Sequence, residues 1–204
     1  MGRKRRHDDG DDDDQASAGK SDDGYTSSAS DASDASRASH GSSGSGSSED
    51  IVNVDFEYFD PAPIDFHAMK RMLVGSFGDD AEEFELSELV DLILEQSAVG
   101  STVKMEDDAD PYAFMSVIGL REHASKKVMQ QLVAYLRRKD RSGKISAVLD
   151  GNTGLLLNER VINMPPQIVP PMLKMLTGEM KEAAEAGKPF DFEHLLLICP
   201  MFRE

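Results

Sequence analysis

The chain has 204 residues with 22 basic and 38 acidic side chains, which gives a formal net charge of −16 at pH 7. Because nucleic-acid affinity depends on neutralising phosphates with Lys and Arg, direct binding to DNA or RNA is not expected, and basic proteins are the favoured partners. The longest apolar runs are far shorter than the roughly 18 residues that a membrane span needs, so no membrane contact is expected.

Residues 1–50 differ sharply in composition from the rest of the chain. They contain 13 Ser and 12 Asp or Glu, but no Val, Ile, Leu or Phe. A segment that buries so little apolar surface cannot offset a backbone entropy cost of roughly 1–2 kcal/mol per residue. We therefore predict a disordered acidic, Ser-rich tail over residues 1–50 and a folded domain over residues 51–204.

Two kinds of short motif stand out in the predicted tail. Arg3-Lys4-Arg5-Arg6 is a basic cluster of the kind that import receptors read, which predicts a nuclear location. The alternative is a solubilising basic end that no receptor reads. Ser28 and Ser47 each precede an acidic residue by three positions, a pattern that acidophilic kinases accept. Alternatively, these serines belong to an unmodified flexible spacer.

The first predicted elements of the folded domain are a strand and two helices. Apolar and polar residues alternate over 52–58, the pattern of a half-buried strand, and a Pro-containing stretch follows it. A helix is predicted from about Asp65. A second helix is predicted with Ser87 as its N-cap and Gly100 at its end.

The middle of the domain is predicted to alternate strands and helices. A short strand over 102–105 leads into an acidic loop over 106–110. The nearly continuous apolar run over 112–120 predicts a central strand covered on both faces. Residues 125–139 carry apolar side chains at helical spacing and predict a helix.

The last third of the chain completes the predicted sheet. Residues 145–149 and 154–157 are expected to form a hairpin around a turn at 150–152. A helix over about 170–186 and a strand over 190–198 follow. The fold class predicted from these elements is α/β (α+β), a mixed, partly antiparallel sheet with helices on both faces.

The loop residues Glu106, Asp107, Asp108 and Asp110 form the densest group of carboxylates in the predicted domain. They lack the alternating ligands and the Gly of a calcium-binding loop, so no metal site is predicted. A solvated acidic loop is one interpretation of the pattern. A contact surface for a basic client protein is the other.

Histidine and cysteine positions give no sign of chemistry. His67, His123 and His194 are isolated, without the partner spacing of a zinc site, and are expected at the surface or the edge of the core. Cys199 is the only cysteine in the sequence, so no intramolecular disulfide is possible, and it is predicted to be a buried structural thiol. No nucleophile–base pair is evident, so no catalytic residue is predicted.

Several motifs between residues 51 and 198 point to a known family. They are Val54 to Pro61, Ile64 to His67, Asp110-Pro111-Tyr112, Leu155 to Arg160, Ile162 to Ile168, and Pro171. Together they closely resemble the BCCIP (Bcp) family. The acidic, Ser-rich tail also resembles that of the family in composition.

The resemblance implies a fold like that of the GCN5-related acetyltransferases, without acetyltransferase activity and without a cofactor. It implies a nuclear adaptor or chaperone that escorts a basic large-subunit ribosomal protein, with shuttling to the cytoplasm as a further expectation. It further implies roles in ribosome biogenesis, nuclear export and protein transport, with nuclear transport receptors as partners, and in cell-cycle and genome-maintenance interactions. Family members continue beyond the position of Glu204, so the domain is expected to be incomplete at its C-terminus.

An acyltransferase-like enzyme with an atypical cofactor site is the alternative function. Acetyltransferases hold the cofactor pyrophosphate with backbone N–H groups in a Gly-rich turn between a strand and a helix. The corresponding turn is predicted at residues 119–125, with a single glycine, Gly119, and with Glu122 where an anion would approach. An enzyme should show N–H groups of this turn clustered toward an empty pocket.

The basic cluster can be tested directly. Replacing Arg3, Lys4, Arg5 and Arg6 by Ala in a fluorescent fusion too large for passive diffusion should remove nuclear enrichment, because import receptors read the positive charge. The measurement is the ratio of nuclear to cytoplasmic fluorescence in living cells. Unchanged nuclear enrichment would place the import signal elsewhere in the chain or on a partner.

Overall fold

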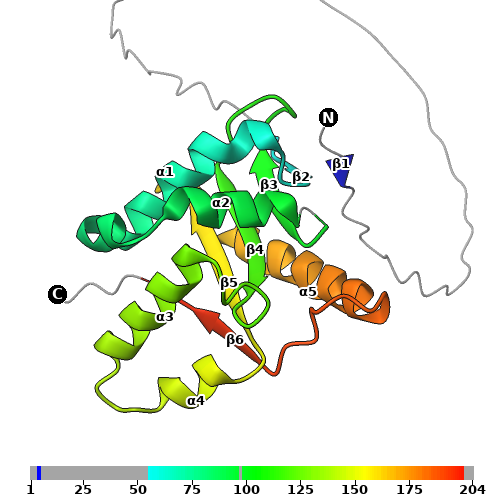
Figure 1. The fold of residues 1–204 in the computed structure, drawn as a ribbon. Coiled ribbons are helices and arrows are strands. Elements are labelled where there is room, and N and C mark those ends of the chain that lie inside the picture. The colour runs from blue at the N-terminus through cyan, green and yellow to red at the C-terminus, as the bar shows by residue number, and fades with distance from the viewer. Residues whose placement is uncertain (1–3, 6–54, 97, 200–204) are drawn as a thin grey trace, which may run out of the picture. The chain divides into compact units, whose positions relative to one another are not determined.

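The computed structural model describes residues 4–5, 55–96 and 98–199. These residues form a six-stranded sheet in the spatial order β1-β2-β3-β4-β5-β6, together with five α-helices (Figure 1). The strands are β1 (Lys4–Arg5), β2 (Glu57–Phe59), β3 (Gly100–Lys104), β4 (Ala113–Gly119), β5 (Thr153–Arg160) and β6 (His194–Leu197). The helices are α1 (Phe66–Phe77), α2 (Leu86–Glu95), α3 (Lys127–Lys139), α4 (Ile145–Asp150) and α5 (Val169–Glu185), with 3-10 turns η1 (Pro63–Asp65), η2 (Gly78–Glu83) and η3 (Pro166–Ile168).

The sheet is mixed, as the sequence predicts. Neighbouring strands from β1 to β5 run antiparallel, whereas β6 runs parallel to β5 because α5 carries the chain back before it. The β4–β5 ladder extends from the pair Ala113 and Arg160 to the pair Gly119 and Gly154. The β5–β6 ladder is short and ends at the pair Leu156 and Leu197.

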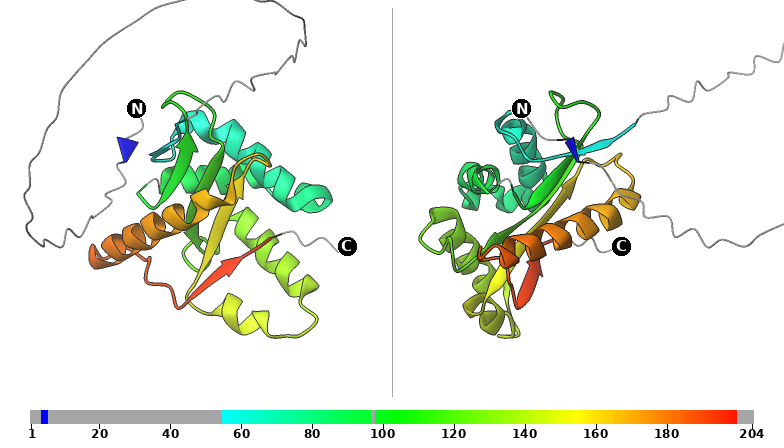
Figure 2. Two further views of the ribbon diagram at one scale, coloured as in Figure 1. Left: turned by 180° about the vertical axis from the view of Figure 1, so that it is seen from behind. Right: turned by 90° about the vertical axis from the view of Figure 1, so that its right-hand side faces the viewer.

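Helices cover both faces of the sheet (Figure 2). Helices α1 to α4 pack on one face, where Phe114 and Ile118 of β4 join their hydrophobic core. Helix α5 covers the other face, where Met115 and Val117 of β4 contact it. Successive residues of a strand point to opposite faces, so β4 is apolar along its length because both of its faces are buried. The predicted central strand is therefore confirmed.

A buried ion pair joins the end of β3 to the start of α1. Lys104 Nζ lies 2.6 Å from Asp65 Oδ1, and both side chains are 0% exposed. The same ammonium donates to the Asp107 carbonyl at 3.0 Å, and the Ala62 N–H donates to Asp65 Oδ2 at 2.9 Å. Burial raises the pKa of the Asp65 carboxyl, and the bonds from Lys104 and Ala62 oppose that rise.

The predicted hairpin over residues 145–157 is wrong. Residues 145–150 form helix α4, and β5 pairs with β4 on one side and β6 on the other. A short apolar run such as 145–149 cannot be assigned to a strand or a helix by periodicity alone. Here the Asp140 carboxylate accepts the N–H of Ile145 at 2.9 Å and so fixes the first turn of a helix.

Both predicted limits of the second helix are also corrected. Helix α2 begins at Leu86 rather than after Ser87, whose hydroxyl accepts a hydrogen bond from Lys70 Nζ at 2.8 Å. Gly100 does not end the helix but begins β3 with a φ of 132°. A Cβ at this position would lie 2.8 Å from the Met115 carbonyl oxygen, so the close approach of β4 requires glycine.

Most of the predicted tail lies outside the described residues, including Ser28 and Ser47. Of the basic cluster, Lys4 and Arg5 form β1 and pair with Phe59 and Tyr58, a strand that the composition did not predict. Within the described part of the chain, no helix has the length and apolar character that a membrane crossing requires.

Loss of Lys104 should strongly destabilise the domain. Lys104→Met leaves the Asp65 carboxylate buried without its cation, which typically costs about 3–5 kcal/mol in the free energy of unfolding. Urea unfolding of the full chain measures this change. The control is Lys127→Met, which removes an exposed pair with Glu85 and should change stability little. An equal, small loss in both variants would contradict the structural role of the buried pair.

Candidate functional site

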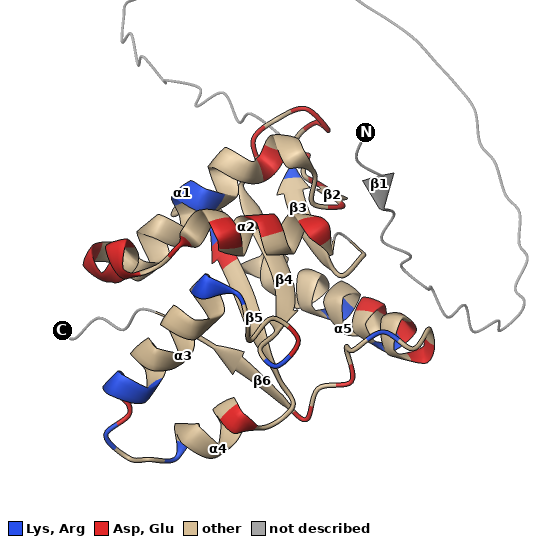
Figure 3. Ribbon diagram, viewed as in Figure 1, with Lys and Arg blue, Asp and Glu red and all other residues tan. Residues whose placement is uncertain are grey.

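The acidic loop connects β3 to β4 and projects beyond the sheet (Figure 3). Glu106, Asp107 and Asp108 are exposed, and no described Lys or Arg forms an ion pair with them. Asp110 differs, because its carboxylate accepts a hydrogen bond from the Arg71 guanidinium of α1 at 2.7 Å. The loop therefore presents three solvated carboxylates at its tip and is anchored to α1 at its end.

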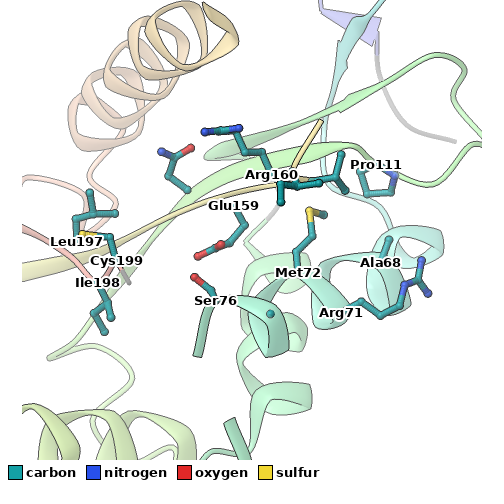
Figure 4. Close-up of a pocket in the computed structure, with 14 residues that line it drawn as sticks. Ala68, Arg71, Met72, Ser76, Pro111, Glu159, Arg160, Leu197, Ile198 and Cys199 are labelled. Carbon is teal, nitrogen blue, oxygen red and sulfur yellow. The ribbon is translucent and has the colours of Figure 1, made fainter. Parts of the chain in front are cut away.

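A groove opens between α1 and the last residues of β5 and β6 (Figure 4). It forms because the last β5–β6 pair is at Leu156, whereas β5 continues four residues further, to Arg160. The cavity has a volume of about 630 Å³. Its apolar lining residues are Met72, Pro111, Val161, Ile162, Leu197 and Ile198.

Glu159 lies in this groove and is the most perturbed carboxyl of the site. It continues the row of Leu155 and Leu157, which point into the core beneath α1. Burial raises the pKa of the Glu159 carboxyl to about 7, and a hydrogen bond from the Ser76 side chain opposes part of that rise. This residue was not identified from the sequence. Its signal in the sequence is an acidic residue at the strand spacing of two after the apolar Leu155 and Leu157.

Two arginines line the same groove, but other groups engage both guanidinium ends. Arg71 reaches Asp110, and Arg160 donates to the Met164 carbonyl at 2.7 Å. Figure 4 shows both guanidinium groups directed away from the Glu159 carboxylate, which points toward Ser76. Among the described residues, no cation forms an ion pair with Glu159.

Cys199 lies at the rim of the groove and is exposed, so the prediction of a buried thiol is wrong. The reason is that β6 ends at Leu197, and the chain leaves the sheet before it reaches Cys199. His67 and His194 are exposed and His123 is half-buried, as expected. In the described part of the chain, no three His, Cys, Asp or Glu side chains come together in a group suited to a metal ion.

Hydrogen bonds within the fold engage several N–H groups of the turn over 119–125. Three of its N–H groups donate to nearby carbonyls: Leu120 to Thr153, His123 to Gly119, and Ala124 to Arg121. At the start of α3, the Val128 N–H is taken by the Glu88 carboxylate at 2.8 Å. A phosphate would have to displace these bonds, so this turn offers no prepared cradle for a cofactor.

The start of α5 is a second place where the fold could hold an anion, since this helix follows β5 beside the groove. Pro170 and Pro171 occupy the first turn of α5, and Pro165 and Pro166 precede it. Proline has no N–H, so half of the donors that a helix N-terminus normally provides are missing here. This end of the helix is therefore also poorly suited to a phosphate group.

Fold and site together define a mixed α/β protein whose described surface offers a charged loop and an apolar groove. The chain belongs to the BCCIP family, whose family model matches residues 51–204. It is 45% identical to the protein bcp1 of Aspergillus oryzae over 164 residues, which are 76% of this chain and 57% of that protein. It is 43% identical to the protein bcp1 of Schizosaccharomyces pombe over 166 residues, which are 76% of this chain and 59% of that protein.

A solved structure supports the same assignment. The crystal structure of BCP1 from Saccharomyces cerevisiae superposes with a TM-score of 0.56 at 31% identity, covering 75% of this chain and 67% of that one. The family resemblance and the mixed α/β fold predicted from the sequence are thus confirmed. The chain spans a little over half the length of the curated relatives it matches.

Glu159 should make the stability of the domain depend on pH. The pKa of Glu159 is about 7 in the folded state and 4.5 in its ordinary state, so folding favours the protonated carboxyl. The stability that this protonation contributes is therefore fully present below pH 4.5 and is lost as pH rises through 7. Glu159→Gln should therefore be more stable than the wild type at pH 8, by at most about 3 kcal/mol, with the difference shrinking toward pH 5. Urea unfolding across this pH range is the measurement. The exposed control Glu193→Gln should follow the wild-type curve, and a parallel Glu159→Gln curve would contradict the assignment.

Proposed function

We propose that this protein is a non-enzymatic adaptor or chaperone for basic client proteins in the nucleus. The observation that carries the proposal is the exposed acidic loop on a domain that is itself acidic, with 16 basic and 26 acidic residues over 51–204. Three carboxylates at the loop tip have no ion-pair partner among the described residues. They are free to attract a cationic protein.

The proposed client is a basic ribosomal protein of the large subunit. Membership in the BCCIP family supports this class of client, as does the acidity of the domain, which disfavours phosphate backbones. A shielding protein of opposite charge would keep such a client soluble before it meets RNA. Nuclear entry through Arg3 to Arg6 and export with transport receptors complete the proposed role in ribosome biogenesis.

Charge at the loop should govern how fast the client is captured. Exposed charges are screened over about 8 Å at physiological salt, so they steer the encounter more than they hold the complex. The backbone of the loop is held by Lys104 through the Asp107 carbonyl. The main chain at the loop tip is therefore tied to the end of β3 in the free protein.

Neutralising the loop tip should slow association and leave dissociation less affected. The variant Glu106→Gln/Asp107→Asn/Asp108→Asn retains Asp110 and its bond to Arg71, so the anchor of the loop is preserved. We expect an association rate lower by roughly tenfold at low salt, with a flatter salt dependence. Purified basic large-subunit ribosomal proteins, tested one at a time by stopped-flow fluorescence, provide the measurement.

The matched control removes the same charge elsewhere. Glu182→Gln/Asp191→Asn/Glu193→Gln changes three exposed carboxylates outside the loop. An equal slowing in both variants would show that net charge, not the loop, steers the client. Failure of every basic ribosomal protein to bind the wild-type chain at any salt would overturn the proposed client class.

A further inference from the structure

The groove beside Glu159 has a main-chain edge that no described strand covers. Asn158 to Arg160 pair with β4 on one side, from Met115 to Ala113. On the other side the β6 ladder has already ended at Leu156 and Leu197, and no described strand takes its place. The backbone groups of this stretch can therefore accept an added extended segment by strand pairing.

The walls of the groove are apolar and partly uncovered. Ile162 is 93% exposed and Leu197 is 47% exposed, while Met72 of α1 faces them across the cavity. A cluster of solvent-exposed apolar side chains indicates a surface that binds another chain.

The floor of the groove carries a carboxyl group that forms no ion pair with a described cation. Glu159 lies between Met72 and the strand end, hydrogen-bonded to Ser76 alone of the described side chains. Arg71 and Arg160 line the same cavity, but Asp110 and the Met164 carbonyl engage them. A carboxylate in a partly dehydrated apolar groove is stabilised by an arriving cation, and arginine in particular binds a carboxylate with two parallel bonds.

We propose that this groove binds an extended segment of a partner protein in which apolar residues flank one lysine or arginine, whose cation pairs with Glu159. This inference rests on the proposed function and adds to it the binding surface and the residues that hold the partner. The free edge of β5 orders the backbone of the segment. The apolar walls take its alternate side chains, and Glu159 selects for the cation between them.

The test uses the full chain and a short labelled peptide of alternating Val and Thr with one central Arg. A second peptide carries neutral citrulline in place of that Arg. Fluorescence anisotropy at physiological salt should show the Arg peptide binding about tenfold more tightly than the citrulline peptide. Glu159→Gln should remove this preference by weakening only the Arg peptide. Because Glu159→Gln is expected to be at least as stable as the wild type, its weaker binding cannot be attributed to unfolding.

A second variant tests the apolar wall without touching the charge. Ile162→Ser alters an almost fully exposed side chain and should weaken both peptides by a similar factor. Its control, Leu173→Ser on α5, changes another exposed apolar residue outside the groove and should leave both affinities unchanged. Equal binding of the two peptides to wild type and Glu159→Gln would overturn the proposal. So would a loss of Arg-peptide binding only when Glu106, Asp107 and Asp108 are neutralised.

The same variants separate this proposal from the proposed function. If a basic ribosomal protein binds Glu159→Gln as tightly as wild type but binds the loop variant more slowly, the groove inference is wrong and the client class stands. If the Arg peptide binds in the Glu159-dependent manner but no basic ribosomal protein binds, the groove inference stands and the client class is wrong. Concentration-dependent dimerisation abolished by Ile162→Ser would show that a second copy occupies the groove, which would also overturn the proposal.

Discussion

The buried contact between Lys104 and Asp65 is the constraint on which both candidate surfaces depend. Asp65 immediately precedes α1, and Lys104 is the last residue of β3. Burying either charge without the other would cost several kcal/mol in desolvation, so the two side chains must stay together in the folded protein. The pair therefore determines where α1 begins with respect to the sheet. Because Lys104 also holds the Asp107 carbonyl, the same ammonium sets the base of the acidic loop. Since α1 forms a wall of the groove, the pair positions that wall as well.

The groove itself follows from the way the chain crosses the sheet. Helix α5 returns the chain so that β6 runs parallel to β5, and β6 ends while β5 continues. In open α/β sheets, ligands gather beyond the carboxyl ends of parallel strands, where such a separation leaves space. A cofactor enzyme would supply phosphate-binding N–H groups at this position. Here two prolines each remove an N–H group and Glu159 adds a carboxyl group, which is the basis for proposing a cationic, extended ligand in the same geometry.

Much of the fold was predictable from the sequence because apolar residues recur in most elements with the spacing of a helix or a strand. The apolar run that became β4 and the helical spacing that became α3 are examples, and the motifs over 51–198 identified the family. Residues 145–149 were misassigned because their helix depends on a cap from Asp140, which periodicity does not reveal. The groove could not be predicted, since it depends on where the β5–β6 ladder stops. Cys199 was placed in the core for the same reason: the end of a strand is decided by tertiary pairing.

The acidic loop and the groove adjoin each other, so a partner attracted by the loop would lie next to the proposed binding groove. Arg71 of α1 bonds to Asp110 at the end of the loop and also lines the groove, and Pro111, the next residue, lines it too. A basic segment drawn toward the loop tip therefore arrives beside the apolar walls without crossing the rest of the surface. Charges at the tip act over about a Debye length and affect the encounter, whereas Glu159 acts only at contact and affects dissociation. Because salt weakens the first effect far more than the second, the proposed function assigns capture of the client to the loop and retention to the groove.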